Sequence, residues 1–147
     1  MSLWDWTLKA YAEAGVPEAC LTLQDAHGQN TSLLLWAVWA EVGDPERLAR
    51  AAAAARDWER LALVPLREVR RALKAPAPPV ADSARLALRE DVKAAELRAE
   101  RVLMETLEAM TGPKGGAHAL RALEGASAAW GPPAPADVLA ALAAALG

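Results

Sequence analysis

Apolar and polar residues follow one another at helical spacing along most of the chain, as in helices that each bury one face. Helix start and stop signals divide this pattern into segments, such as Asp44-Pro45 at a start and Gly15 or Gly28 at an end. Because Pro65 lacks a backbone donor and clashes with the preceding turn, we expect it to stop or kink a helix near Leu63. The predicted helical segments are 2–14, 17–28, 31–42, 45–63, 65–74, 82–110, 117–130 and 137–146.

A proline-rich stretch interrupts this pattern between the two longest helical regions. It reads Ala-Pro-Ala-Pro-Pro-Val, and it predicts an extended, polyproline-like linker near residues 75–81. We expect residues 1–130 to form a single helical domain that contains this linker. Residues 131–147 are expected to form an Ala- and Pro-rich C-terminal tail with a short helix.

The composition favours an all-α protein. About a quarter of the residues are alanine, and isoleucine and phenylalanine are absent, so strong helix formers dominate. We therefore predict a compact irregular bundle of about six to seven helices, with the apolar segment 31–42 at its centre. A net charge of -3 gives no strong nucleic-acid signal.

The sequence also indicates where such a protein would work. It contains one cysteine, no signal peptide and no apolar run long enough to cross a bilayer. We therefore expect a cytoplasmic protein with no membrane association.

A polar block beside the most apolar segment is the first candidate site. It contains Gln24, Asp25, His27 and Asn30. In a structural role, Asp25 or Gln24 would accept hydrogen bonds from the exposed amides that begin the next helix. In the alternative role, the same groups would recognise a ligand together with two tryptophans on the neighbouring helix, Trp36 and Trp39.

Catalytic and metal sites have little support. Cys20 and His27 share a helix face, but seven residues of helix place them about 10 Å apart along the axis, too far for a direct hydrogen bond. His27 and His118 are the only histidines, and no metal-ligand spacing occurs. Common nucleotide-binding and hydrolase motifs are absent. We predict no catalytic residue, no metal and no cofactor, and we regard an enzyme as the less favoured class.

Two further features are candidates for binding a partner. Four basic residues, Arg67, Arg70, Arg71 and Lys74, lie within two helical turns and suit an anion or an acidic partner. They also suit a solvated surface paired with nearby carboxylates. The long helix 82–110 carries a seam with heptad spacing, which serves either the domain's own packing or a protein partner or homodimer. The seam comprises Leu88, Val92, Ala95, Ala99, Val102 and Thr106.

Several short stretches together carry a resemblance to a known family. They are Ser2-Leu3-Trp4-Asp5-Trp6, Leu23-Gln24-Asp25 with Gly28 and Asn30, the run Leu33 to Trp39, and Pro65-Leu66-Arg67 through Leu73-Lys74. Over about residues 1–110 the chain resembles a family of short all-helical proteobacterial proteins of unknown function. The resemblance implies the fold and the cytoplasmic location, and it brings no activity.

These observations favour a non-catalytic protein-interaction or adaptor module. The alternatives are a helical protein that binds a small apolar or aromatic ligand, and an enzyme without a recognisable motif. A pocket lined by the polar block and Trp36 would favour ligand binding. An exposed apolar surface on the long helix would favour a protein partner.

Overall fold

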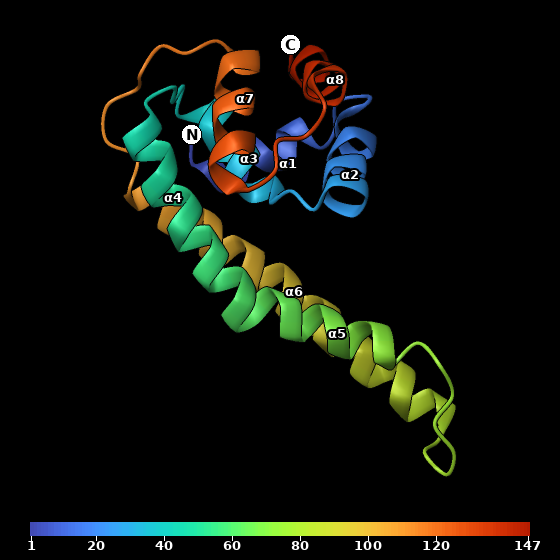
Figure 1. The fold of residues 1–147 in the computed structure, drawn as a ribbon. Helices are drawn as coiled ribbons and strands as arrows, with labels where there is room; N and C mark the ends of the chain where they lie inside the picture. Colours follow the sequence, from blue (N-terminus) through green and yellow to red (C-terminus); the bar gives the residue numbers. More distant parts are fainter.

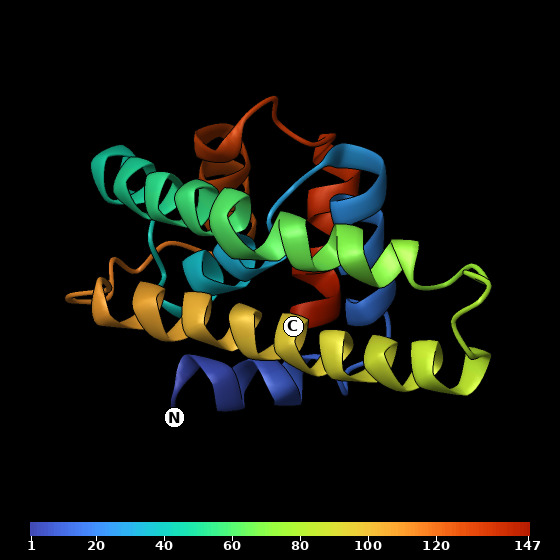
Figure 2. The same cartoon turned by 90° about the horizontal axis from the view of Figure 1, so that it is seen from below.

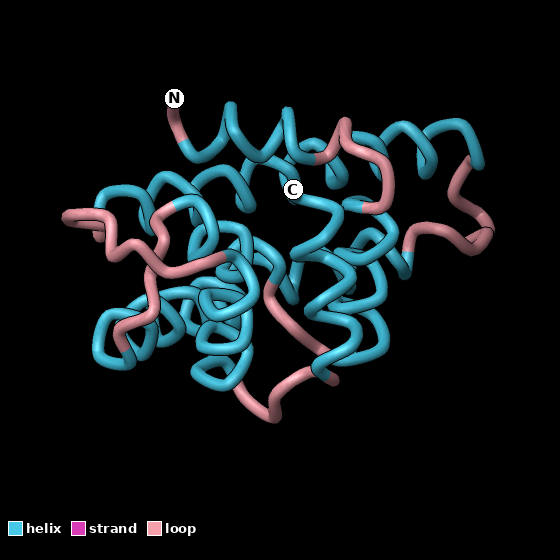
Figure 3. The backbone as a smooth tube through the Cα atoms, turned by 90° about the horizontal axis from the view of Figure 1, so that it is seen from above, coloured by secondary structure: helices cyan, strands magenta, loops and turns pink.

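Eight α-helices and one π-helical turn make up the fold in the computed structural model, which describes residues 1–147 (Figure 1). They are α1 (Leu3–Ala10), α2 (Val16–His27), α3 (Thr31–Trp39), α4 (Pro45–Trp58), η1 (Glu59–Leu63), α5 (Val64–Ala72), α6 (Asp82–Ala109), α7 (Ala119–Trp130) and α8 (Ala136–Leu146). Because η1 joins α4 to α5 without a break, seven separate helical rods result. The backbone contains only helices and loops (Figure 3), and this confirms the predicted all-α bundle. No helix is both long and apolar enough to cross a membrane.

Local capping interactions set several of the helix boundaries, as the sequence predicts. The Asn30 side chain accepts a hydrogen bond from the Leu33 amide at 2.9 Å and so begins α3. The Asp44 carboxylate accepts the first amides of α4 in the same way. Gly28 ends α2 in the left-handed conformation that glycine adopts without strain.

Near Leu63, where we expected a stop or a kink, the helix does not stop. The chain continues through η1, in which the Val64 amide donates to the carbonyl of Glu59, one residue farther back than in an α-helix. This wider turn places Pro65 in the first turn of α5, where no intrahelical donor is needed. Figure 2 shows α4 and α5 as one continuous rod beside α6.

The core surrounds α3, which is buried on nearly all sides as predicted. Leu33, Leu34, Leu35 and Trp36 are all fully buried, and α3 packs mainly against α6 and α7. This explains why α3 is apolar without interruption from Leu33 to Trp39.

Residues 131–147 contain the short helix expected there, and its apolar face is part of the common core. Leu139 and Leu142 of α8 are buried with the other core residues. The helix packs against α2 and α7 (Figure 1). The segment described from the sequence as a tail is thus packed onto the N-terminal half of the chain.

The helices α5 and α6 form an antiparallel hairpin that projects from the other helices (Figure 1). We call residues 64–98 the arm. The main contacts of α5 are with α6 and η1, and none of its residues is buried. The linker expected near residues 75–81 is the loop at the tip of the arm. It contains a turn closed by the Val80 amide and the Ala77 carbonyl, where we expected extended chain.

The seam on α6 is not the face that packs within the chain. Of its six residues only Ala99 is buried, and Val92 is half-buried. The buried residues of α6 are Arg85, Ala99, Leu103, Met104 and Leu107, so the packing face shares Ala99 with the seam but leaves most of the seam outside. The apolar repeat did not reveal which face of α6 packs against α5, because arginine and glutamate side chains, such as Arg85 and Glu96, lie on that face along the arm.

Candidate functional site

Two of the four predicted basic residues are paired within the arm. Arg70 contacts both carboxylate oxygens of Glu96, with N–O distances of 2.6 and 3.4 Å. Arg67 lies 3.7 Å from Glu96 and 3.9 Å from Glu59. Both arginines therefore hold α5 against α6, which matches the paired reading for these two positions.

Two arginines of α6 complete this polar interface, and sequence reasoning missed them. The Arg85 side chain donates to the carbonyl of Leu73 at 3.0 Å, and Arg89 donates to the carbonyl of Arg70 at 3.1 Å. These carbonyls lie at the end of α5, where the helix leaves acceptors unpaired and favours positive charge. Arg85 and Arg89 are four residues apart and so lie on one face of α6, and this spacing was the sequence signal that could have identified them.

The other two basic residues, Arg71 and Lys74, remain candidates for binding an anion or a partner. Both are exposed, and neither forms an ion pair. They lie on the last turn of α5 and just beyond it, close to the tip of the arm. Their charge is therefore available to a molecule from outside.

The polar block does not form the cluster that the sequence suggested. Asn30 caps α3, whereas Asp25 is exposed and has no hydrogen-bond partner in the structure, so the expectation that Asp25 or Gln24 caps this helix is wrong. His27 is half-buried in the last turn of α2. Gln29, which we did not single out, is buried and donates to the Pro132 carbonyl at 3.0 Å.

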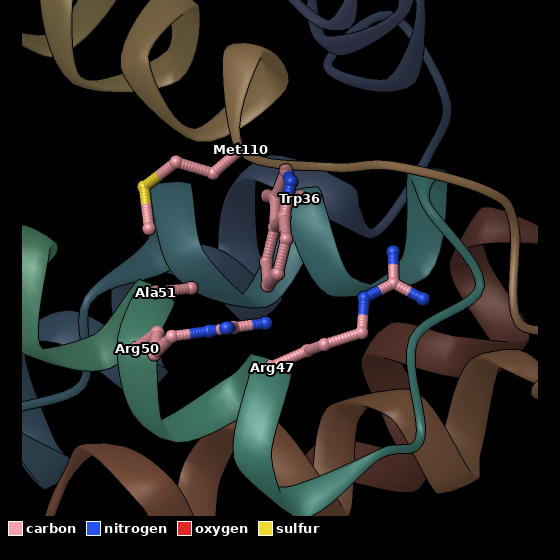
Figure 4. A pocket seen from close by; sticks show the side chains of 5 residues that line it. All are labelled: Trp36, Arg47, Arg50, Ala51 and Met110. Atoms are coloured by element: carbon pink, nitrogen blue, oxygen red, sulfur yellow. The ribbon is translucent and has the colours of Figure 1, made fainter.

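Gln24 and Trp36 line different cavities. Gln24 lies on a groove of about 370 Å³ between α2 and the arm, whose other side chains are Arg70, Lys93, Glu96, Leu97 and Glu100. Trp36 lines a cavity of about 340 Å³ with Arg47, Arg50, Ala51 and Met110 (Figure 4). Trp39 is partly buried against the core.

The groove beside Gln24 contains a perturbed carboxyl group. Burial, and then the neighbouring Glu96 carboxylate, raise the pKa of Glu100, while Arg67 and Arg70 lower it. The net effect is a raised pKa, so this carboxyl favours its neutral form more than an exposed glutamate does. Arg67 and Arg70, the two arginines that pair with Glu96, offset part of this rise in the Glu100 pKa.

Cys20 lies in a setting that suppresses thiolate formation. Burial raises the pKa of the Cys20 thiol, and burial together with Cys20 raises the pKa of Tyr11 far above its usual range. A thiol with a raised pKa is a poor nucleophile at neutral pH. This electrostatic setting suits a packing role for Cys20.

Comparison with known families decides the classification. Residues 2–107 match the family described as "Protein of unknown function (DUF2390)". The chain belongs to this family. The DUF2390 match includes α1 to α5 and nearly all of α6, and therefore the whole arm. The resemblance noted in the sequence is confirmed as one to a family of unknown function.

The other comparisons add no relative. No curated protein matches the chain, and no solved structure matches it. The description of the DUF2390 family brings no activity.

Proposed function

We propose that the protein is a non-catalytic protein-interaction module that binds a partner through its arm. The observation that carries the proposal is the exposed apolar seam on α6. We call four of its residues, Leu88, Val92, Ala95 and Val102, the outer seam. The side chain of Leu88 is 51% exposed, and only Val92 of the four is even half-buried.

The spacing of the outer seam suits a second helix. Apolar residues that alternate at three and four positions form a continuous stripe along one side of a helix. Within the arm, α5 contacts α6 through Arg70, Arg85 and Glu96. Leu88, Ala95 and Val102 of the stripe stay exposed. A contiguous apolar stripe left exposed is typical of an interaction surface.

Charge favours an acidic partner. The arm contains eight basic and five acidic side chains, which gives it a net charge of +3. Because the whole chain has a net charge of -3, the rest of the protein has -6. The unpaired Arg71 and Lys74 contribute to the positive charge of the arm. We therefore propose that the occupant is an acidic, amphipathic helix of another protein.

The same charge argues against pairing of two arms. Two arms with net positive charge repel one another, and screening by salt only weakens this effect. A homodimer through the long helix is therefore the less favoured alternative, and the experiment has to distinguish it from binding of another protein. We place the interaction in the cytoplasm, which the single cysteine supports.

The test compares two exposed leucines. The protein is captured from its native cells as wild type, as Leu88→Ser and as the control Leu8→Ser, whose leucine is 55% exposed on α1. We expect one partner to be retained by wild type and Leu8→Ser and lost by Leu88→Ser. The purified partner should then bind directly, with a Kd that Leu88→Ser raises about tenfold and that increases with salt.

Two outcomes would overturn the proposal. If Leu88→Ser binds the partner as tightly as Leu8→Ser does, the outer seam is not the interface. If sedimentation shows a homodimer that Leu88→Ser dissociates, the occupant is a second copy of this chain. The two variants have matched exposure, so a general loss of stability would affect both.

A further inference from the structure

We propose that Arg47, Arg50 and Arg121 form a binding site for a small molecule that carries a phosphate group. The site lies where α4 meets α7 and the end of α6, and it is independent of the proposed interaction through the arm. Two cavities share Arg47 there. One is the cavity of about 340 Å³ beside Trp36, and the other, of about 330 Å³, contains Arg121 and Gly115.

The three guanidinium groups have no carboxylate partner. None of them takes part in any ion pair of the structure. The acidic residue that borders the second cavity, Asp44, accepts hydrogen bonds from the Glu46 and Arg47 amides at 3.3 and 3.4 Å. That carboxylate therefore does not neutralise the arginines by direct contact.

Contacts within the chain fix the wall of the first cavity. Arg47 donates to the carbonyl of Thr111, and the Thr111 hydroxyl accepts the Trp36 indole N–H at 2.8 Å. Figure 4 shows Arg50 extending below the Trp36 ring and Arg47 beside it, with Met110 on the opposite side. A wall that is held in place before binding reduces the entropy lost when a ligand binds.

The second cavity has an equally fixed wall. A Cβ atom on Gly115 would lie 2.7 Å from the backbone oxygen of Glu41, so the loop after α6 is pressed against the end of α3. The Ala117 amide donates to the same oxygen at 3.0 Å. These contacts hold the loop beside Arg121, and they explain why glycine occupies this position.

The chemistry of the lining selects the ligand class. Guanidinium groups bind phosphate through paired, charge-assisted hydrogen bonds. Two of them border each cavity, Arg47 with Arg50 in the first and Arg47 with Arg121 in the second, and a pair of positive charges suits a phosphate dianion better than a single carboxylate. Met110, which is exposed, adds an apolar side chain to the first cavity, while Trp36 and Ala51 border it as buried residues. A cavity of about 340 Å³ suits a small organic molecule. The expected ligand is a phosphate ester with a compact apolar group.

Phenyl phosphate is the probe that tests this assignment, and benzoate is its carboxylate counterpart. Calorimetric titration of the full chain should show saturable binding of phenyl phosphate, tighter than that of inorganic phosphate. Benzoate should bind at least about tenfold more weakly, since it carries one charge and fewer acceptors. Equal binding of benzoate would overturn the phosphate assignment, and no saturable binding of phenyl phosphate up to about 10 mM would overturn the site.

Charge-matched variants locate the binding. Arg50→Gln and Arg121→Gln should each raise the Kd for phenyl phosphate about tenfold, because each removes a charged hydrogen-bond donor. The control Lys9→Gln removes one positive charge from α1 and should leave the Kd unchanged. An equal effect of Lys9→Gln would show general attraction to the protein and would overturn the site. Circular dichroism of each variant checks that it remains folded.

Discussion

Arg89 on α6 donates its Nε–H to the backbone carbonyl of Arg70 on α5 across 3.1 Å. One turn away, Arg85 makes the same kind of contact with the carbonyl of Leu73. The arm is thus joined by side chains of one helix that satisfy the C-terminal acceptors of the other. This arrangement leaves the apolar residues of the outer seam unburied, and it makes the stability of the arm sensitive to single arginines.

Replacing Arg85 by methionine should loosen the arm without unfolding the protein. Arg85→Met keeps much of the buried stem but leaves the Leu73 carbonyl without its donor, which costs about 1–2 kcal/mol. Hydrogen exchange of the α5 amides should accelerate accordingly, while α3 amides keep their protection. The control Arg98→Met changes an exposed arginine on the same helix. Unchanged exchange in α5 would contradict this account of the arm.

The Trp36–Thr111 hydrogen bond should contribute to global stability. Thr111→Val leaves the buried indole N–H unsatisfied and should lower the free energy of unfolding by about 1–2 kcal/mol. Thr106→Val is the matched control, because both hydroxyls donate to the carbonyl four residues earlier but Thr106 is exposed. Urea denaturation of both variants measures the difference. Equal losses would show that the indole contact adds nothing.

Gly115 should tolerate no side chain, whereas Gly131 should tolerate one. Gly115→Ala would place a Cβ 2.7 Å from a backbone oxygen, so the loop must shift at a cost of about 1–3 kcal/mol. Gly131 has extended backbone, and no atom lies within 4 Å of the place that an added methyl group would take, so Gly131→Ala should change stability by less than about 0.5 kcal/mol. Thermal unfolding distinguishes the two. Similar melting temperatures for both variants would contradict the close approach of the loop.

Glu100 should make the protein less stable as the pH rises. Its pKa in the folded chain is raised above the ordinary 4.5 by burial and by Glu96, so the folded state binds more protons than the unfolded state. Stability from this group is therefore present below pH 4.5 and is lost as the pH rises through the folded pKa.

The variant Glu100→Gln tests that direction. It should raise the free energy of unfolding at pH 7 relative to wild type and give little gain at pH 4. Glu105→Gln is the control, because that carboxylate is exposed and pairs with Arg101. Chemical denaturation at both pH values measures the effect. A gain at pH 4 equal to that at pH 7 would show that the cause is not ionisation.

Helix ends could be predicted from the sequence where a residue and its hydrogen-bond partners lie within one turn of each other. Asn30, Asp44 and Gly28 act within one turn of their own positions, and their roles as caps could be predicted. The effect of Pro65 could be predicted only in part, because a π turn, which leaves no marker in the sequence, accommodates it without a stop. The apolar repeat left the packing face of α6 open, because charged side chains such as Arg85 and Glu96 occupy part of that face along the arm.

The candidate sites depend on contacts between distant segments. Gln29 reaches Pro132 across 103 residues of chain, and no periodicity reports such a contact. The cavity beside Trp36 likewise combines α4 with the end of α6, so Arg47 and Arg50 had no visible connection to that tryptophan. Sequence reasoning named Trp36, but the arginines around it emerge only from the fold.

The packing of α8 against α2 has a consequence for protein synthesis. The apolar residues of α2, including Val16 and Leu23, leave the ribosome more than a hundred residues before Leu139 and Leu142 are made. Until then this helix has an uncovered apolar surface in a crowded cell. An exposed apolar surface of this kind favours aggregation, so α2 is protected only once the last helix of the chain has been made.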